Sequence, residues 1–220
     1  MPIKCVKFIT ELKNLISKFP KAVTEDLVRL LFIKAHPNSE IEVPYMRSKL
    51  PTTPIRIQSS KMRYFASKRI RADLVCKKED MVVEFKCHRK TDYSPCCTAT
   101  DMGAVFCDLN RLSCLDNKEK YFIYVFDSSM QNYYNKIMKK HTPSCPLQMF
   151  DISSTAVGKS FIVDKTLDSV THGYNEFRKT AFSSFVSACN AFSCFNYSID
   201  ILQAQNIGNT GYYIIIAQIK

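Results

Sequence analysis

Two short strand-like segments joined by a polar tetrapeptide constrain the fold of this chain more than any other feature. Residues 70–76 (IRADLVC) and 81–87 (MVVEFKC) have the length and composition of strands, and residues 77–80 (KKED) separate them by a tight turn. If Cys76 faces Met81, alternation places one apolar set on a single face: Ala72, Leu74, Cys76, Val83, Phe85 and Cys87. That face requires burial, so the hairpin belongs to a sheet that other elements cover.

The opposite face of this hairpin carries charge. In the same register Asp73 lies directly opposite Glu84, and Arg71 lies opposite Lys86. Like charges that face each other on a sheet are destabilising, so the two carboxylates require a nearby cation. Lys86 supplies one, and a divalent metal would supply a better one, because Mg²⁺ prefers oxygen ligands and keeps positions open for phosphate. A surface ion-pair cluster is the alternative interpretation, and a one-residue shift in register would separate the carboxylates.

The positive charge of the chain is concentrated around the same hairpin. The formal net charge is +11, and residues 47–90 contain thirteen Lys and Arg against four Asp and Glu, which is nine of the eleven surplus charges. A surplus of this size favours a polyanionic partner, and contact with phosphate is preferred over a merely solvated basic face. With 46% hydrophobic and 23% charged residues, the composition is that of a globular protein and excludes disordered, collagen-like and coiled-coil chains.

Hydrophobic periodicity predicts five helices. We expect them over residues 3–18, 24–34, 101–115, 130–140 and 167–192. The expected buried stripes of the first three are Val6, Ile9, Leu12 and Ile16; Leu27, Leu30 and Leu31; and Met102, Val105, Leu109 and Leu112. Thr24 is placed to cap the second helix, and Glu25 and Asp26 follow in its first turn.

Further strands are expected on both sides of the hairpin. They cover residues 41–45, 121–127, 147–152 and 160–163, and a C-terminal hairpin pairs residues 195–205 with 212–219. We expect residues 46–68 to form a long basic loop with at most a short strand near 55–57. We therefore predict one α/β domain over residues 1–220, with a mixed central sheet flanked by helices and a C-terminal α+β extension packed on it.

Several other classes of protein do not fit the sequence. The ten cysteines form no C-x-x-C pair and the four histidines are scattered, so we do not expect a zinc site. Lysines interrupt the N-terminal residues, and the longest apolar run, Tyr212–Ala217, is too short to span a bilayer. We expect an intracellular, cytoplasmic protein that does not bind membranes. Nucleophile-elbow and phosphate-loop motifs do not occur.

Asp73, a ten-residue gap and then Glu84-Phe85-Lys86 resemble the PD-(D/E)xK motif of the restriction-endonuclease-like nucleases. The predicted order of helix, strand, hairpin, helix and strand over residues 22–127 is similar to the αβββαβ core of that family, and residues 128–220 lie outside the resemblance. One difference is that Ala72, rather than proline, precedes Asp73.

The resemblance implies an endonuclease, of a restriction or mobile-element kind, that hydrolyses phosphodiester bonds in DNA. Asp73, Glu84 and the backbone carbonyl of Phe85 would hold Mg²⁺, for which Mn²⁺ is an expected substitute, and Lys86 would orient or help to deprotonate the attacking water. Members of the family often add an acid from the first helix, for which Glu25 is the first candidate and Asp26 the second. Favourable charge at a helix N-terminus explains Glu25 equally well.

The nucleic acid itself would meet the basic residues near the motif: Lys68, Arg69, Arg71, His88, Arg89 and Lys90. Cleavage of both DNA strands usually needs two sites, which a homodimer would provide. Two alternatives stay open: a catalytically inactive nucleic-acid-binding or assembly module of the same fold, and an RNA-cleaving relative that stacks bases on Tyr64, Phe65 and Tyr93. Asp108 and Arg111 are spaced for an i,i+3 pair, for which helix solubility and a role in the site are equal explanations.

Overall fold

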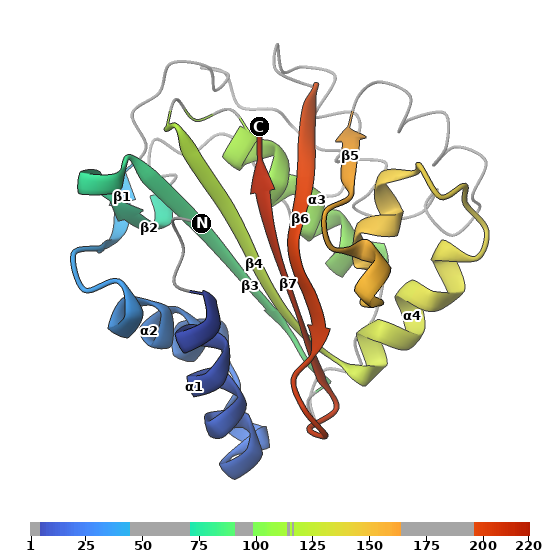
Figure 1. The fold of residues 1–220 in the computed structure, drawn as a ribbon, viewed down its shortest axis with the longest axis horizontal. Helices are drawn as coiled ribbons and strands as arrows, with labels where there is room; N and C mark the ends of the chain where they lie inside the picture. Colours follow the sequence, from blue (N-terminus) through green and yellow to red (C-terminus); the bar gives the residue numbers. More distant parts are fainter. Residues whose placement is uncertain (1–4, 45–70, 91–98, 114, 116, 164–195) are drawn as a thin grey trace, which may run out of the picture.

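The computed structural model describes residues 5–44, 71–90, 99–113, 115, 117–163 and 196–220. Within these residues the protein is a mixed α/β structure with one seven-stranded mixed sheet and four α-helices (Figure 1). The helices are α1 (Cys5–Lys18), α2 (Glu25–Ala35), α3 (Ala99–Ser113) and α4 (Ser128–Met138). The strands are β1 (Glu40–Pro44), β2 (Arg71–Cys76), β3 (Met81–His88), β4 (Glu119–Asp127), β5 (Ser160–Val163), β6 (Tyr197–Asn206) and β7 (Tyr212–Ile219).

The strand order is β1-β2-β3-β4-β7-β6-β5. Strands β3 and β4 are parallel, and every other neighbouring pair is antiparallel. A parallel pair requires a crossover connection, and α3 supplies it on one face of the sheet. Strand β3, which precedes this crossover, carries Glu84 and Lys86, so the topology places α3 beside these residues.

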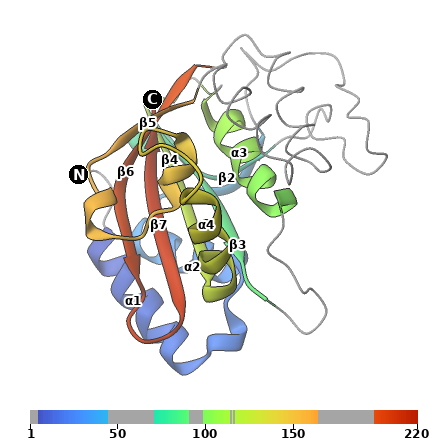
Figure 2. The ribbon, with the colours of Figure 1, turned by 90° about the vertical axis from the view of Figure 1, so that its right-hand side faces the viewer.

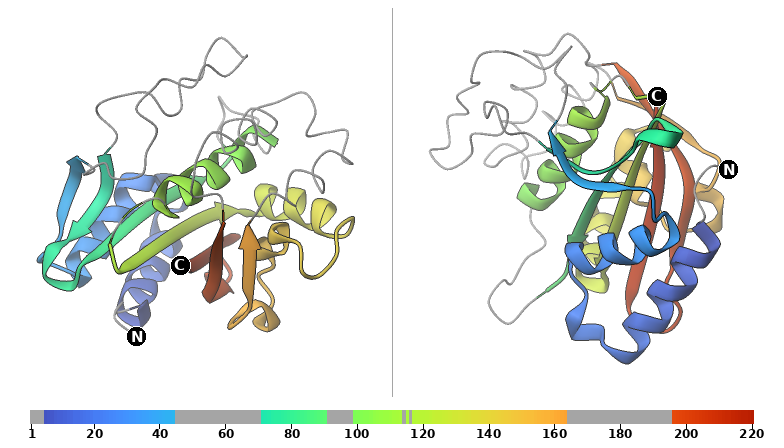
Figure 3. Two further views of the ribbon diagram at one scale, coloured as in Figure 1. Left: turned by 90° about the horizontal axis from the view of Figure 1, so that it is seen from above. Right: turned by 90° about the vertical axis from the view of Figure 1, so that its left-hand side faces the viewer.

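Helices cover both faces of the sheet, with α1 and α2 on one face and α3 and α4 on the other (Figures 2 and 3). On the first face Phe32 of α2 packs edge-to-face on Phe8 of α1 and on Phe85 of β3. On the second face Tyr134 of α4 stacks on Phe150 with ring centroids 3.8 Å apart. The central strands are therefore buried from both sides, which explains the unbroken apolar run of β4.

The four helices predicted within the described residues form, and the predicted buried stripe of α3 is confirmed, whereas that of α2 is wrong and that of α1 is confirmed only in part. In α2 the buried residues are Val28, Phe32 and Ala35, and Leu30 is 59% exposed. The segment has apolar residues on several sides, so spacing alone does not select a face, and the face with the large Phe32 ring packs against the sheet. In α1 Leu12 and Ile16 are buried as predicted, whereas Val6 is 82% exposed and Phe8, which was not predicted, is buried.

The remaining predictions of secondary structure have mixed outcomes. The strand expected over 147–152 is wrong, because the chain there forms a 3₁₀ helix, Pro146–Phe150, which proline begins. The strand at 160–163 and the helix at 130–140 are confirmed as β5 and α4. The expected strand near 55–57 and the expected helix over 167–192 lie outside the described residues.

The C-terminal hairpin is part of the main sheet. Strand β7 pairs with β4 from Tyr121–Gln218 to Asp127–Tyr212, and β6 pairs with β7 on its other side. The segment expected to pack on the core as an extension thus contributes three strands to the core sheet. None of the helices in the described part of the chain combines the length and hydropathy needed to cross a bilayer.

Candidate active site

The site begins where the backbone pairing of the β2–β3 hairpin stops. The predicted turn is present as a short 3₁₀ helix, Lys77–Glu79, followed by Asp80 in the left-handed region. The predicted register is confirmed for the pairs Leu74–Val83, Val75–Val82 and Cys76–Met81. The ladder ends with Leu74–Val83, so the positions of Asp73 and Glu84 come directly after its last pair.

A side chain replaces the missing backbone acceptor at this point. The backbone N–H of Phe85 donates to Oδ2 of Asp73 at 2.8 Å. The expected face-to-face pairs Asp73–Glu84 and Arg71–Lys86 are thus not part of the ladder, because Asp73 uses its carboxylate to accept a main-chain hydrogen bond. A buried N–H needs an acceptor, and this one is an anion, which makes the bond stronger than a neutral one.

Asp73 is held from the side of α2. Nη2 of Arg29 lies 3.0 Å from Oδ1 of Asp73, and the Arg29 side chain is only 12% exposed. The same guanidinium lies 3.6 Å from Glu25 and 3.4 Å from Asp26 on its own helix. Arg29 therefore links the first turn of α2 to the end of the β2–β3 ladder.

Glu84 is held from the other face of the sheet. Its side chain is 1% exposed, and its Oε2 lies 3.1 Å from Nη2 of Arg111 on α3. The same Arg111 nitrogen lies 2.9 Å from Oδ1 of Asp108, which confirms the predicted i,i+3 pair. A buried carboxylate is costly without a counterion, so Arg111 is part of the reason that Glu84 can occupy this position.

Lys86 contacts both helices. Its Nζ lies 2.8 Å from Oδ2 of Asp108 on α3 and 3.9 Å from Oε2 of Glu25 on α2. Burial by itself would lower the pKa of Lys86, but the charges of Asp108 and Glu25 outweigh it and raise the pKa above its ordinary value. Lys86 is therefore an ammonium ion across the physiological range.

Glu25 is the first residue of α2, directly after the cap. Thr24 accepts a hydrogen bond from the Leu27 backbone N–H at 3.3 Å, as predicted, and this cap begins the helix beside Lys86. Burial raises the pKa of Glu25, the charges of Asp73 and Asp108 add to the rise, and Lys86 and Arg29 oppose it. The sequence explains Glu25 equally well as a helix-terminus charge and as the acid of the first helix. In the structure its carboxylate lies within ion-pair distance of Arg29 and Lys86.

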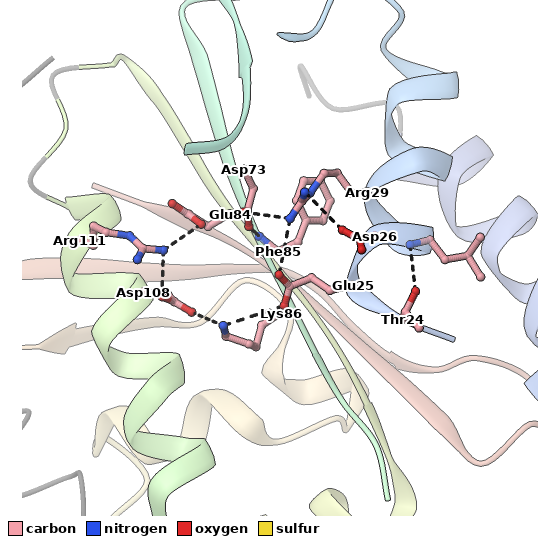
Figure 4. A network of polar contacts seen from close by, with 11 residues as sticks. Thr24, Glu25, Asp26, Arg29, Asp73, Glu84, Phe85, Lys86, Asp108 and Arg111 are labelled. Carbon is pink, nitrogen blue, oxygen red and sulfur yellow. Dashed lines mark hydrogen bonds and ion pairs between the residues drawn. The ribbon is translucent and has the colours of Figure 1, made fainter. Parts of the chain in front are cut away.

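Together these residues form one connected network of charges (Figure 4). Arg29 joins Glu25 to Asp73, while Arg111, Asp108 and Lys86 lead from Glu84 back to Glu25. The network contains four carboxylates and three cationic side chains, and Asp26 at its edge is 83% exposed. The balance of fixed charge is therefore negative.

The donor chemistry of the network fits a hard cation in part. Among the described residues, no group of three or more His, Cys, Asp or Glu side chains is arranged to hold a metal ion. Mg²⁺, however, is commonly bound through only one or two carboxylates together with water and phosphate. Asp73 and Glu84 supply carboxylates of the kind that Mg²⁺ prefers, and the negative balance of the network is compatible with a cation.

The predicted phosphate-contacting residues lie around the end of β3 or outside the described part. His88 ends β3, and its Nδ1 lies 2.9 Å from the Tyr124 hydroxyl. Burial lowers the pKa of His88. Arg89 donates to the Lys21 carbonyl at 2.7 Å, and Lys90 is exposed.

The other three predicted phosphate contacts cannot be placed in the site. Arg71 begins β2 but its side chain is not described, and Lys68 and Arg69 lie outside the described residues. The same holds for the aromatic residues of the RNA alternative: Tyr64, Phe65 and Tyr93.

Arg29 is a site residue that the sequence did not predict, and for Asp108 and Arg111 the sequence left solubility and a role in the site as equal explanations. Arg29 follows Glu25 by one helical turn, which is a local signal for an ion pair but does not indicate Asp73. Asp108 is 7% exposed, so solubility of the helix does not explain it.

Comparison of the chain with protein-family models, with curated proteins and with solved structures found no match to any of them.

Proposed function

We propose that this chain is a metal-dependent nuclease of the PD-(D/E)xK, restriction-endonuclease-like type, and that it cleaves DNA. The observation that carries the proposal is that Asp73, Glu84 and Lys86 belong to one partly buried charge network at the end of the β2–β3 ladder. Chance occurrence of the motif in a sequence would not require its side chains to be linked through shared ion-pair partners in this way.

The order of elements supports the same proposal. Helix α2 and strands β1, β2 and β3 are followed by α3 and β4, which is the αβββαβ order of the restriction-endonuclease-like core. In addition, β1–β3 are antiparallel neighbours and β4 is parallel to β3, so the crossover through α3 occupies the position expected for that core.

The metal would be Mg²⁺, with Mn²⁺ as a substitute, held by Asp73, Glu84 and the carbonyl of Phe85. When bound, such an ion supplies Lewis acidity toward the phosphoryl oxygen and lowers the pKa of a coordinated water. Arg29 already pairs with Asp73, and Arg111 already pairs with Glu84. When a metal binds, each arginine would share its carboxylate with the ion or release it.

The remaining side chains have roles that follow from their charge. Lys86 is an ammonium ion and is suited to orient water and to stabilise negative charge on the scissile phosphate, which is preferred here to deprotonation of the water. Glu25 has a raised pKa and lies beside Lys86, so it is the better candidate to accept a proton from the attacking water. DNA is the proposed substrate because of the basic surplus near the motif, and a homodimer would cut both strands.

The test is cleavage of supercoiled DNA, linear DNA and structured RNA with Mg²⁺, with Mn²⁺ and with chelator. We expect metal-dependent nicking of DNA, and a loss of about a hundredfold or more in Lys86→Ala, because a preorganised charge at the reacting phosphate is removed. Lys77→Ala is the matched control: it removes the same charge from the turn of the same hairpin, where Lys77 pairs with Glu40 at 2.9 Å. Full activity of Lys86→Ala would contradict the catalytic assignment, and preferred cleavage of RNA would change the substrate.

A second candidate, a nucleic-acid-binding module without hydrolysis, is favoured by one specific observation. Asp73 and Glu84 each already pair with an arginine, as they would in a site that serves stability alone. Such a module would bind DNA with an affinity that falls steeply with salt, because the basic residues release counterions. Binding of this kind by the wild type, with no cleavage under any metal, would select the second candidate.

A further inference from the structure

We propose that Asp108 is a positioning residue that holds the Lys86 ammonium away from the two carboxylates Asp73 and Glu84. The proposal rests on the proposed nuclease function and adds helix α3 to its machinery. It assigns to Asp108 an effect on the reaction that operates through Lys86 and not through contact with the substrate.

Each carboxylate oxygen of Asp108 binds a different cation. Oδ2 lies 2.8 Å from Nζ of Lys86, and Oδ1 lies 2.9 Å from Nη2 of Arg111. With both oxygens engaged and only 7% of the residue exposed, Asp108 has little freedom to turn. A carboxylate fixed in this way defines the position of the flexible lysine that it binds.

Lys86 needs such a partner because Glu84 is its neighbour. The two residues are two positions apart on β3, so their side chains leave the strand on the same face. An unrestrained ammonium would pair with the Glu84 carboxylate and compete with a metal for it. In the structure the two are kept separate, since Glu84 binds Arg111 and Lys86 binds Asp108 and Glu25 (Figure 4).

Solubility of α3 does not account for this arrangement. An exposed Asp–Arg pair at i,i+3 would serve solubility, whereas here the Asp108 side chain is 10% exposed and the Arg111 side chain 22%. Burial of these charges is costly unless each has a partner, and the partners on β3 are two of the motif residues.

The experiment compares the wild type with Asp108→Asn, which removes the charge and retains the shape. We expect kcat for DNA cleavage to fall about a hundredfold, as for a misplaced catalytic group, while the Kd for DNA stays within about twofold. Glu40→Gln is the matched control, because it removes a carboxylate from an exposed ion pair with Lys77 and should change neither value. Asp108→Glu, which keeps the charge and displaces it by one methylene, should retain more activity than Asp108→Asn.

A second readout does not use activity. The affinity of the protein alone for Mn²⁺ should weaken about tenfold in Asp108→Asn, as is common when an outer partner of a metal site is removed. It should return to the wild-type value in the double variant Asp108→Asn/Lys86→Met, because the competing ammonium is gone. Asp108→Glu provides the same comparison with the charge retained if Asp108→Asn does not fold.

The outcomes separate the two proposals. Wild-type cleavage together with unchanged kcat and unchanged Mn²⁺ affinity in Asp108→Asn overturns the role of Asp108 and leaves the nuclease function intact. A loss of Mn²⁺ affinity that persists equally in the double variant also overturns it, because Asp108 would not act through Lys86. A wild type that neither cleaves nucleic acid nor binds Mn²⁺ overturns both.

Discussion

The sheet contains two antiparallel hairpins, β2–β3 and β6–β7, and they differ in how far their strands stay paired. In β6–β7 the pairing runs from Ile199–Ile219 to Asn206–Tyr213, with one register shift between Ile201 and Gln203. In β2–β3 it stops after three pairs, at Leu74–Val83. The long pairing of β6–β7 forms part of the core sheet. In β2–β3 the pairing ends at Leu74–Val83, so the Phe85 N–H and the Asp73 side chain beyond it are available to bond each other and the neighbouring helices.

The difference follows from the residues at the equivalent places. Strand β7 has four consecutive buried apolar residues, Ile214–Ala217, which pack on both faces of the sheet. Strand β2 has Asp73 at the point where its ladder ends, and the carboxylate accepts the Phe85 N–H in place of a backbone carbonyl. Helices from both faces then reach this end of the hairpin, α2 through Arg29 and α3 through Arg111.

The largest effect on stability is expected in the longer of the two hairpins, β6–β7. Ile216→Ala in β7 should lower the free energy of unfolding by about 2–5 kcal/mol, because it leaves a cavity at a fully buried position. Urea denaturation measures this loss. DNA cleavage per folded molecule should stay at the wild-type value, and a parallel loss of cleavage would show that the two hairpins are not independent.

The next effect is expected at the end of the short ladder. Asp73→Ala should lower the free energy of unfolding by about 2–3 kcal/mol, because it leaves the Arg29 charge and the Phe85 N–H without this partner. Asp73→Asn should lower it by less, since the amide oxygen can still accept from Phe85. Equal losses in the two variants would contradict the idea that the side chain substitutes for the backbone ladder.

A smaller effect is expected at the N-terminal cap of α2, the helix whose first turn is linked through Arg29 to the end of the β2–β3 ladder. Thr24→Ala should lower the free energy of unfolding by about 1 kcal/mol, because the Leu27 N–H loses its acceptor. Thermal denaturation measures the change, and Thr24→Ser, which keeps the hydroxyl, is the control. If Thr24→Ala lowers DNA cleavage while Thr24→Ser does not, the first turn of α2 is part of the site.

The smallest effect is expected from the pH dependence of Glu25. Burial raises the pKa of Glu25 in the fold, so the folded state binds this proton more tightly than the unfolded state does. The stabilising contribution is therefore present below the ordinary pKa and is lost as the pH rises through the raised one. In urea titrations, Glu25→Gln should gain stability relative to the wild type as the pH rises from below the ordinary pKa of a glutamate through the raised pKa of Glu25. A difference that stays constant with pH would contradict the burial of this carboxyl.

The sequence predicted the hairpin register up to Leu74–Val83 and the buried face of α3 correctly, but it predicted the wrong buried face for α2. Turn length and alternation are local properties of the chain, so the pairing of Cys76 with Met81 could be predicted from the sequence. The choice of Phe32 over Leu30 as the buried side chain of α2 depends on the fit to Phe8 and Phe85, which are distant in sequence. For the same reason Arg29, 44 positions before Asp73, had no local signal that linked it to the site.

By itself, the sequence determined the two strands of the β2–β3 hairpin, the tight turn between them and the spacing of Asp73, Glu84 and Lys86 along these strands. These follow from backbone geometry over a few residues, in which alternation and turn length leave little choice. Only the tertiary structure decided which counterion each charge receives: Arg29 for Asp73, Arg111 for Glu84 and Asp108 for Lys86. Buried charges must be paired where they lie, and that place depends on how α2 and α3 pack on the sheet.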